Sequence, residues 1–163
     1  MHIGTVVLAI VVSAGSVARA DDAHDALSLT GLQMRSLALS RDINDSVVGA
    51  LTEIRASGDT RTPDCLGSLR DTGGEISDVL DGVAGLAIVT AEMNDPRDEK
   101  VASSYRNIYA KGALDRLRLD RRTVNQVAGE CANQLLVQNK ARDLIQLIDD
   151  ASVALGSLKS AGD

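Results

Sequence analysis

The sequence contains no Phe and no Trp, and its only aromatic residues are Tyr105 and Tyr109. A core made of Leu, Ile, Val and Ala lacks the large side chains that fill wide spaces between layers. Such a core suits close packing of helix on helix better than a sheet sandwich. The sequence also lacks a run of strictly alternating apolar residues, which is the pattern of a half-buried strand. These absences predict an all-α protein.

Histidine is equally scarce, since His2 and His24 are the only two. Zinc sites, haem ligation and the Ser-His-Asp and Cys-His arrangements of hydrolases all depend on histidine at their centre. We therefore expect no catalytic residue, no metal site and no cofactor, and we expect that the protein is not an enzyme.

Basic charge is in the minority, with 17 Lys and Arg against 23 Asp and Glu and a net charge of −6. Phosphate backbones repel a chain of this charge, so we expect no nucleic-acid partner. The densest basic stretch lacks the interleaved aromatic residues that stack on bases, and it includes acidic residues. It comprises Lys111, Arg116, Arg118, Arg121 and Arg122, with Asp115 and Asp120 among them.

The longest apolar run lies near the N-terminus, from Val6 to Val12, and Ala18-x-Ala20 follows it. A short apolar core before small residues at these positions is typical of a Sec-type signal peptide. The alternative is a membrane anchor, but a spanning helix needs about 20 apolar residues. We expect residues 1–20 to be cleaved, no stable membrane insertion afterwards, and one helical-bundle domain over residues 21–163. The mature protein would then be periplasmic or secreted from a bacterium.

The chain has only two prolines, and each follows a residue that caps helices, in Thr62-Pro63 and Asp95-Pro96. Proline suits the first turn of a helix, so both positions predict helix starts. Between them an apolar stripe recurs every seven residues, as in a coiled coil. Its members are Leu69, Ile76, Val83 and Thr90. This pattern predicts two long antiparallel helices that reverse near residues 95–98.

The two cysteines, Cys65 and Cys131, face each other in this hairpin. In an oxidising compartment, such a pair predicts a disulfide, whereas buried free thiols are the alternative. Closing the long loop between them stabilises the fold by about 4 kcal/mol in the chain-entropy model. The same register predicts ion pairs of Glu75 with Arg121 and of Asp78 with Arg118.

Two further helical regions flank the hairpin. The first is expected from about Ala23 to Ser57, with an apolar stripe that includes Leu27, Met34, Ile43, Val47 and Leu51. The apolar period after Cys131 continues to Leu158, and the polar stretches at 120–123 and 138–140 are the two candidate breaks. We favour the second break, which makes an antiparallel bundle of four long helices; without a break the bundle has three. A disulfide would staple either bundle.

Small residues make the second helix slim at Gly82, Ala84, Gly85 and Ala87. They predict close packing inside the bundle, or alternatively a surface for a partner helix.

A different group could line a ligand pocket between helices, because tyrosines present an apolar body and a polar tip. Its members are Tyr105, Tyr109, Arg116 and Arg118.

These features lead to two functional hypotheses. The first is an exported non-enzymatic structural or interaction protein that presents a helix face to an unknown protein partner or to itself. The alternative is a periplasmic, sensor-like four-helix module that binds a small ligand. Gly31-x-Gln33-Met34-Arg35 resembles the Gly-x-Gln-Arg-Met helix of bacterial nitrate-type and type IV pilus sensor domains, with Met and Arg inverted. We transfer no binding role from these few residues.

Overall fold

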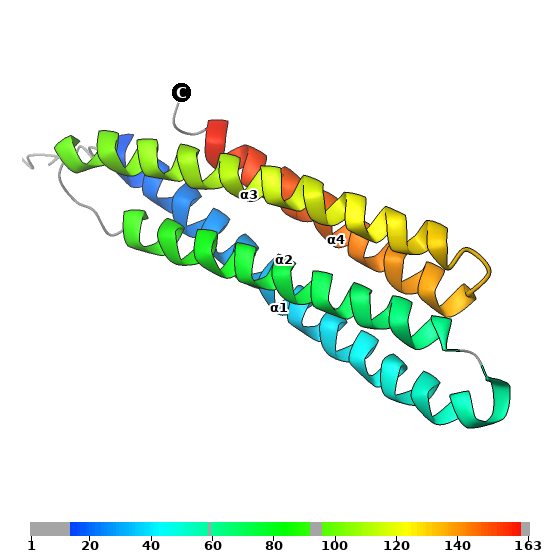
Figure 1. The fold of residues 1–163 in the computed structure, drawn as a ribbon. Helices are drawn as coiled ribbons and strands as arrows, with labels where there is room; N and C mark the ends of the chain where they lie inside the picture. The colour runs from blue at the N-terminus through cyan, green and yellow to red at the C-terminus, as the bar shows by residue number, and fades with distance from the viewer. Residues whose placement is uncertain (1–13, 59, 92–95, 161–163) are drawn as a thin grey trace, which may run out of the picture.

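The computed structural model describes residues 14–58, 60–91 and 96–160, and within them it contains four α-helices and no strand. They are α1 (Ala14–Ser57), α2 (Arg61–Ala91), α3 (Pro96–Glu130) and α4 (Leu135–Ser160). Consecutive helices are antiparallel and form an elongated bundle (Figure 1). The predicted all-α antiparallel bundle is confirmed, and it has four helices rather than three. Most of the predicted signal peptide, residues 1–13, lies outside the described residues.

The helices do not contact one another equally. α1 packs on α2 along most of its length, and α3 packs on α2 and α4. α4 also contacts α1 directly and α2 across the diagonal, whereas the described parts of α1 and α3 do not approach each other. α3 therefore has α2 on one side and α4 on the other, and its remaining surface is free of other helices.

α1 ends where the sequence predicts and begins earlier. Gly58 follows Ser57 with a φ of 69°, a left-handed conformation that glycine adopts easily and that terminates helices. The predicted start near Ala23 is wrong, because the helix begins at Ala14. No proline interrupts residues 14–22, so the helix can include them.

The reversal between α3 and α4 occurs at residues 131–134, so both predicted break positions are wrong. The stretch at 138–140 instead belongs to the first turns of α4. There the Gln138 amide donates hydrogen bonds to the Ala128 and Cys131 carbonyls, at 2.7 and 3.3 Å. The Ala128 carbonyl belongs to the last turn of α3, and the Cys131 carbonyl, which also accepts a hydrogen bond from the Gln134 backbone N–H at 3.0 Å, follows that turn directly. A polar residue after the turn thus caps the helix before it.

The core confirms the predicted stripe of α2 and corrects that of α1. Leu69, Ile76, Val83 and Thr90 are all at most 6% exposed. In α1, Ile43 and Val47 are buried as expected. Leu27, Met34 and Leu51 were expected in the core, but they are exposed, and Leu29 is fully buried instead. The true stripe passes through a polar residue, Ser36, which hides its period in the sequence.

Cys65 and Cys131 form the predicted disulfide, with Cα atoms 6.7 Å apart. The bond joins the first turn of α2 to the residue just after α3, at the end of the hairpin opposite its turn. It closes a chain segment with a sequence separation of 66 residues. The two helices of the hairpin are thus held covalently at one end.

Close backbone packing occurs at Gly73 and not at the glycines that the sequence suggested. A Cβ at Gly73 would lie 3.4 Å from the Cβ of Ser40 on α1. Gly82 and Gly85 are exposed, and a Cβ at either would meet no atom within 4 Å. Of the slim segment, only Ala84 and Ala87 are buried. The expectation of close packing therefore fails for the two glycines, which leave part of α2 bare.

Candidate functional site

A groove of about 320 Å³ lies between α2 and α3. Most of its lining is apolar or glycine, and two charged residues lie at the end nearer the disulfide. The residues from α2 are Asp78, Val79, Gly82 and Val83, and those from α3 are Ile108, Tyr109, Gly112, Ala113 and Arg116. Gly82 and Gly112 line it from opposite helices, and neither glycine has an atom within 4 Å of where a Cβ would stand. The two glycines therefore leave the groove open to solvent.

Large apolar side chains continue the groove towards the turn between α2 and α3. On α3, Val101, Tyr105 and Ile108 are each at least 50% exposed. They recur at intervals of three and four residues, so they share one flank of the helix with Gly112. Ile108 and Gly112 line the groove, so this flank borders it.

α2 presents a matching flank. Val79, Gly82, Leu86 and Val89 also recur at intervals of three and four residues, and Val89 is 56% exposed. We call the two flanks together the open face. It comprises Val79, Gly82, Gly85, Leu86 and Val89 of α2 with Val101, Tyr105, Ile108 and Gly112 of α3.

Charged residues join α2 to α3 on the disulfide side of the groove. Arg116 lies 2.5 Å from Glu75 and its Nε lies 3.4 Å from the Asp120 carboxylate. Asp120 is buried, and its Oδ2 has no hydrogen-bond partner among the described residues. Burial raises the pKa of Asp120 to about 6; Arg116 opposes this shift, and the nearby Glu75 carboxylate adds to it. The sequence offered no sign that Asp120 is buried, because it lies in the densest charged stretch.

The four predicted ligand-binding residues do not form a single site. Tyr109 and Arg116 lie together in the groove. Tyr105 is on the same flank but outside the lining residues, and 51% of it is exposed. Arg118 points to a different hollow, lined by Asn107 and Lys111 among others, and pairs with Asp115 at 2.7 Å. Helical spacing separates Arg118 from Arg116, since residues two apart lie on different faces.

The predicted cross-helix ion pairs are wrong, although the cysteine register is right. Glu75 pairs with Arg116 rather than with Arg121, and Arg121 pairs instead with Asp149 of α4. Arg118 pairs with Asp115 of its own helix rather than with Asp78. Backbone register alone does not choose among arginines on neighbouring turns, because their long side chains reach along the helix as well as across it.

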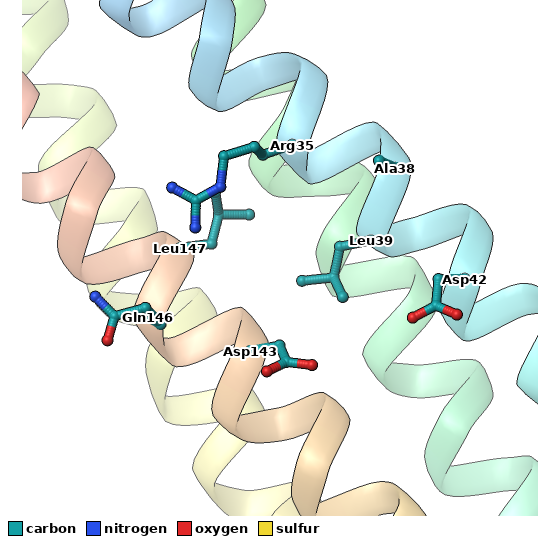
Figure 2. Close-up of a pocket in the computed structure, with 7 residues that line it drawn as sticks. All are labelled: Arg35, Ala38, Leu39, Asp42, Asp143, Gln146 and Leu147. Carbon is teal, nitrogen blue, oxygen red and sulfur yellow. The ribbon is translucent and has the colours of Figure 1, made fainter.

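A second hollow, of about 410 Å³, lies between α1 and α4 and is shown in Figure 2. Leu39 and Leu147 line it, and Arg35 extends from α1 towards α4. Arg35 pairs with Asp150 at 2.8 Å, and other ion-pair partners at this seam are Asp42 and Lys140. These charged groups already form ion pairs between α1 and α4. The α2–α3 groove is therefore the better candidate for binding.

The open face presents mainly apolar side chains and glycine, with few polar groups. The polar side chains that line its groove belong to Asp78, Tyr109 and Arg116. The guanidinium of Arg116 already forms an ion pair with Glu75. Over the part of the chain that the structure describes, no three His, Cys, Asp or Glu residues are placed to hold a metal ion. None of the described helices has both the length and the apolar character needed to cross a membrane.

Comparison of the chain with protein-family models, with curated proteins and with solved structures finds no match. A function for this chain must therefore follow from its own residues.

Proposed function

We propose that the protein is an exported, non-enzymatic interaction protein whose open face receives a helix of a protein partner. The observation that carries this proposal is the exposure of Val89, Val101, Tyr105 and Ile108 on the two helix flanks that border a groove lined by glycine on both sides. Contiguous exposed apolar surface is uncommon on monomers and marks interaction sites. A helix with apolar residues every three or four positions is the natural occupant of such a groove.

Location in the periplasm or outside the cell is part of this proposal. The predicted signal peptide and the Cys65–Cys131 disulfide both support it, because such bonds persist in oxidising compartments. Intact mass of the protein recovered from an expressing bacterium tests this part. We expect loss of residues 1–20 and no alkylation before reduction. A chain that retains residues 1–20, or whose cysteines are both alkylated before reduction, would contradict it.

Site-specific photo-crosslinking in the expressing cell tests the open face. A photoreactive amino acid replaces Ile108, and in a control it replaces Val153, an equally apolar residue of α4 that is 75% exposed. We expect an adduct with a defined protein at position 108 and none at position 153. Equal labelling at both positions, or none at either, would overturn the proposal.

The alternative function, binding of a small ligand, is favoured by one observation: Tyr109 and Arg116 line the same groove. It predicts that a compound from a metabolite panel raises the melting temperature of the protein and that Tyr109→Ala abolishes the increase. An interaction protein predicts no such compound, so the thermal screen separates the two functions.

A further inference from the structure

We infer that the partner at the open face is a second copy of this chain, in a two-fold dimer in which α2 of each copy packs on α3 of the other. This inference rests on the proposed function, because it uses the same face. The symmetry axis lies parallel to α2 and α3, midway between them. Rotation about such an axis makes an isologous interface. Every residue keeps its position along the direction of the helices, which we call its level.

Levels along the hairpin follow from the disulfide, which places Cys65 level with Cys131. Counted from that bond, Gly82 lies 17 residues along α2 and Gly112 lies 19 residues back along α3, so these two glycines, which line the groove from opposite helices, are also close in level. The rotation therefore brings each residue of α2 opposite the α3 residues of the second copy that lie at the same level. The helices that meet are antiparallel, because α2 and α3 are antiparallel within one chain.

The surfaces that meet in this dimer are complementary in shape. Gly85 lies one turn beyond Gly82, and Ile108 lies one turn before Gly112, so Gly85 and Ile108 are level. Ile108 is 66% exposed, whereas a side chain at Gly85 would meet nothing within 4 Å. The bulky flank of α3 thus meets the slim flank of α2, and large against small is how packed layers interdigitate.

The charges are complementary as well. Among the residues whose exposure the structure describes, α2 exposes five acidic residues and one basic residue, whereas α3 exposes six basic residues and three acidic ones. A dimer that places α2 on α3 therefore joins helices of opposite net charge. The other two-fold arrangement, with α2 on α2 and α3 on α3, joins like charges and is disfavoured.

One pair of charges makes the arrangement testable. Asp71 lies six residues from Cys65 along α2, and Arg122 lies nine residues from Cys131 along α3, so the two are within about one helical turn of the same level. Both are exposed and lie on the outward side of their helices. The dimer brings Arg122 of each copy opposite Asp71 of the other. Nearer the middle, Asp78 comes opposite Asp115, where Arg116 and Arg118 lie beside them and offset the like charge.

Sedimentation equilibrium of the oxidised, exported protein is the first measurement. We expect the wild-type chain to dimerise with concentration. Ile108→Glu and Gly82→Arg should each weaken dimerisation by about 100-fold, because they place a charge or a bulky side chain at the centre of the contact. Val153→Glu and Gly156→Arg, at exposed positions of α4, are the matched controls and should dimerise as the wild type does. Circular dichroism should show the same helix content in all five proteins.

A mixing experiment then tests which helices meet. Asp71→Arg alone places two like-charged pairs in the dimer, and so does Arg122→Asp alone, so each variant should dimerise weakly. Mixing the two variants gives a heterodimer in which both pairs are of opposite charge. Native mass spectrometry should therefore find the heterodimer in the mixture and few homodimers. Failure of mixing to restore association would overturn the arrangement of α2 on α3.

The outcomes separate this inference from the proposed function. A wild-type chain that stays monomeric, while position 108 cross-links to a different protein, overturns the second copy as partner and leaves the proposed function standing. A monomer in which position 108 cross-links to its own residues 1–13 would assign the open face to that segment and overturn the inference too. A monomer without any adduct at position 108 overturns both.

Discussion

The two sides of α2 are built differently. Towards α1, small residues meet: the Ser36 hydroxyl donates to the Gly73 carbonyl at 2.7 Å, and the Ser40 hydroxyl donates to the Arg70 carbonyl at 3.2 Å. Towards α3, the helices are joined by a disulfide at one end and by the Glu75–Arg116 pair, and a groove remains beyond them. Small residues let two backbones approach and exclude solvent without a covalent bond. On the α3 side, large side chains lie opposite glycines without filling the space between the two helices. The disulfide therefore holds α2 and α3 together, and apolar surface stays exposed.

Removing the Cys65–Cys131 disulfide should change the stability of the α3 side of α2 more than any other variant does. We expect Cys65→Ser combined with Cys131→Ser to lower the free energy of unfolding by about 2 to 4 kcal/mol, because the unfolded chain regains the freedom of a long loop. Urea unfolding of the variant and of the wild type measures the change. Hydrogen exchange should become faster in α3 than in α1, since α1 keeps its own contacts with α2.

Reduction of the wild-type disulfide serves as the control for this variant and should give the same loss. A variant as stable as the oxidised wild type would show that the α2–α3 interface does not depend on the bond.

The next effect concerns the buried carboxyl of Asp120 and depends on pH. Its pKa is raised to about 6, so the folded chain holds this proton over a range in which the unfolded chain has released it. Asp120 therefore contributes stability that falls as pH rises from about 4 to about 6. We expect Asp120→Asn to be more stable than the wild type by about 1 to 3 kcal/mol at pH 7.5, where the wild type buries a charge. The two proteins should be similar at pH 4.

Thermal or urea unfolding of both proteins at each pH measures this difference. A difference in stability that does not change between pH 4 and pH 7.5 would contradict the raised pKa.

A smaller effect should follow from loosening the α1 side of α2. Ser36→Ala removes the hydroxyl and leaves the Gly73 carbonyl without this donor in a buried place. We expect a loss of about 1 kcal/mol in the free energy of unfolding. Ser46→Ala is the matched control, because the Ser46 hydroxyl is bonded only within α1, to the Asp42 carbonyl. The control should change stability by less than about 0.5 kcal/mol; an equal loss in both variants would refute the role of Ser36.

The smallest expected change in stability comes from replacing a glycine, and it should differ between the two sides of α2. Gly82→Ala should raise the stability of the monomer by about 0.5 to 1 kcal/mol, because alanine favours helix and the new methyl group meets no atom. Gly73→Ala should gain less, since its methyl group would lie 3.4 Å from Ser40. Melting temperatures measured on dilute protein check this order. The reverse order would mean that the open side of α2 is packed and the α1 side is not.

Much of the fold could be predicted, because it depends on local signals that recur. Proline at residues 63 and 96 and the glycine at residue 58 mark helix ends, and the heptad from Leu69 to Thr90 is buried as its period predicts. The reversal after Cys131 was missed because no turn dipeptide marks it; its carbonyls are capped by Gln138, a residue of the next helix.

The candidate site was only partly predictable. Tyr109 and Arg116 were expected to line a pocket and do line the groove, but Arg118 lies on another face of α3. The glycines of the groove, Gly82 and Gly112, were not recognised as its walls. Composition shows that such residues are small, but it does not show whether a neighbouring helix or solvent lies beside them.

The sequence by itself determined the helical class, the hairpin and the pairing of Cys65 with Cys131, because periodicity and capping act through neighbours along the chain. Only the tertiary structure decided which flank of each helix is covered. Whether Gly73 or Gly82 is packed, and whether Asp120 is buried or solvated, depends on where α1, α3 and α4 lie around α2. A residue's own spacing does not encode the position of helices that are distant in sequence, and so the open face became visible only in three dimensions.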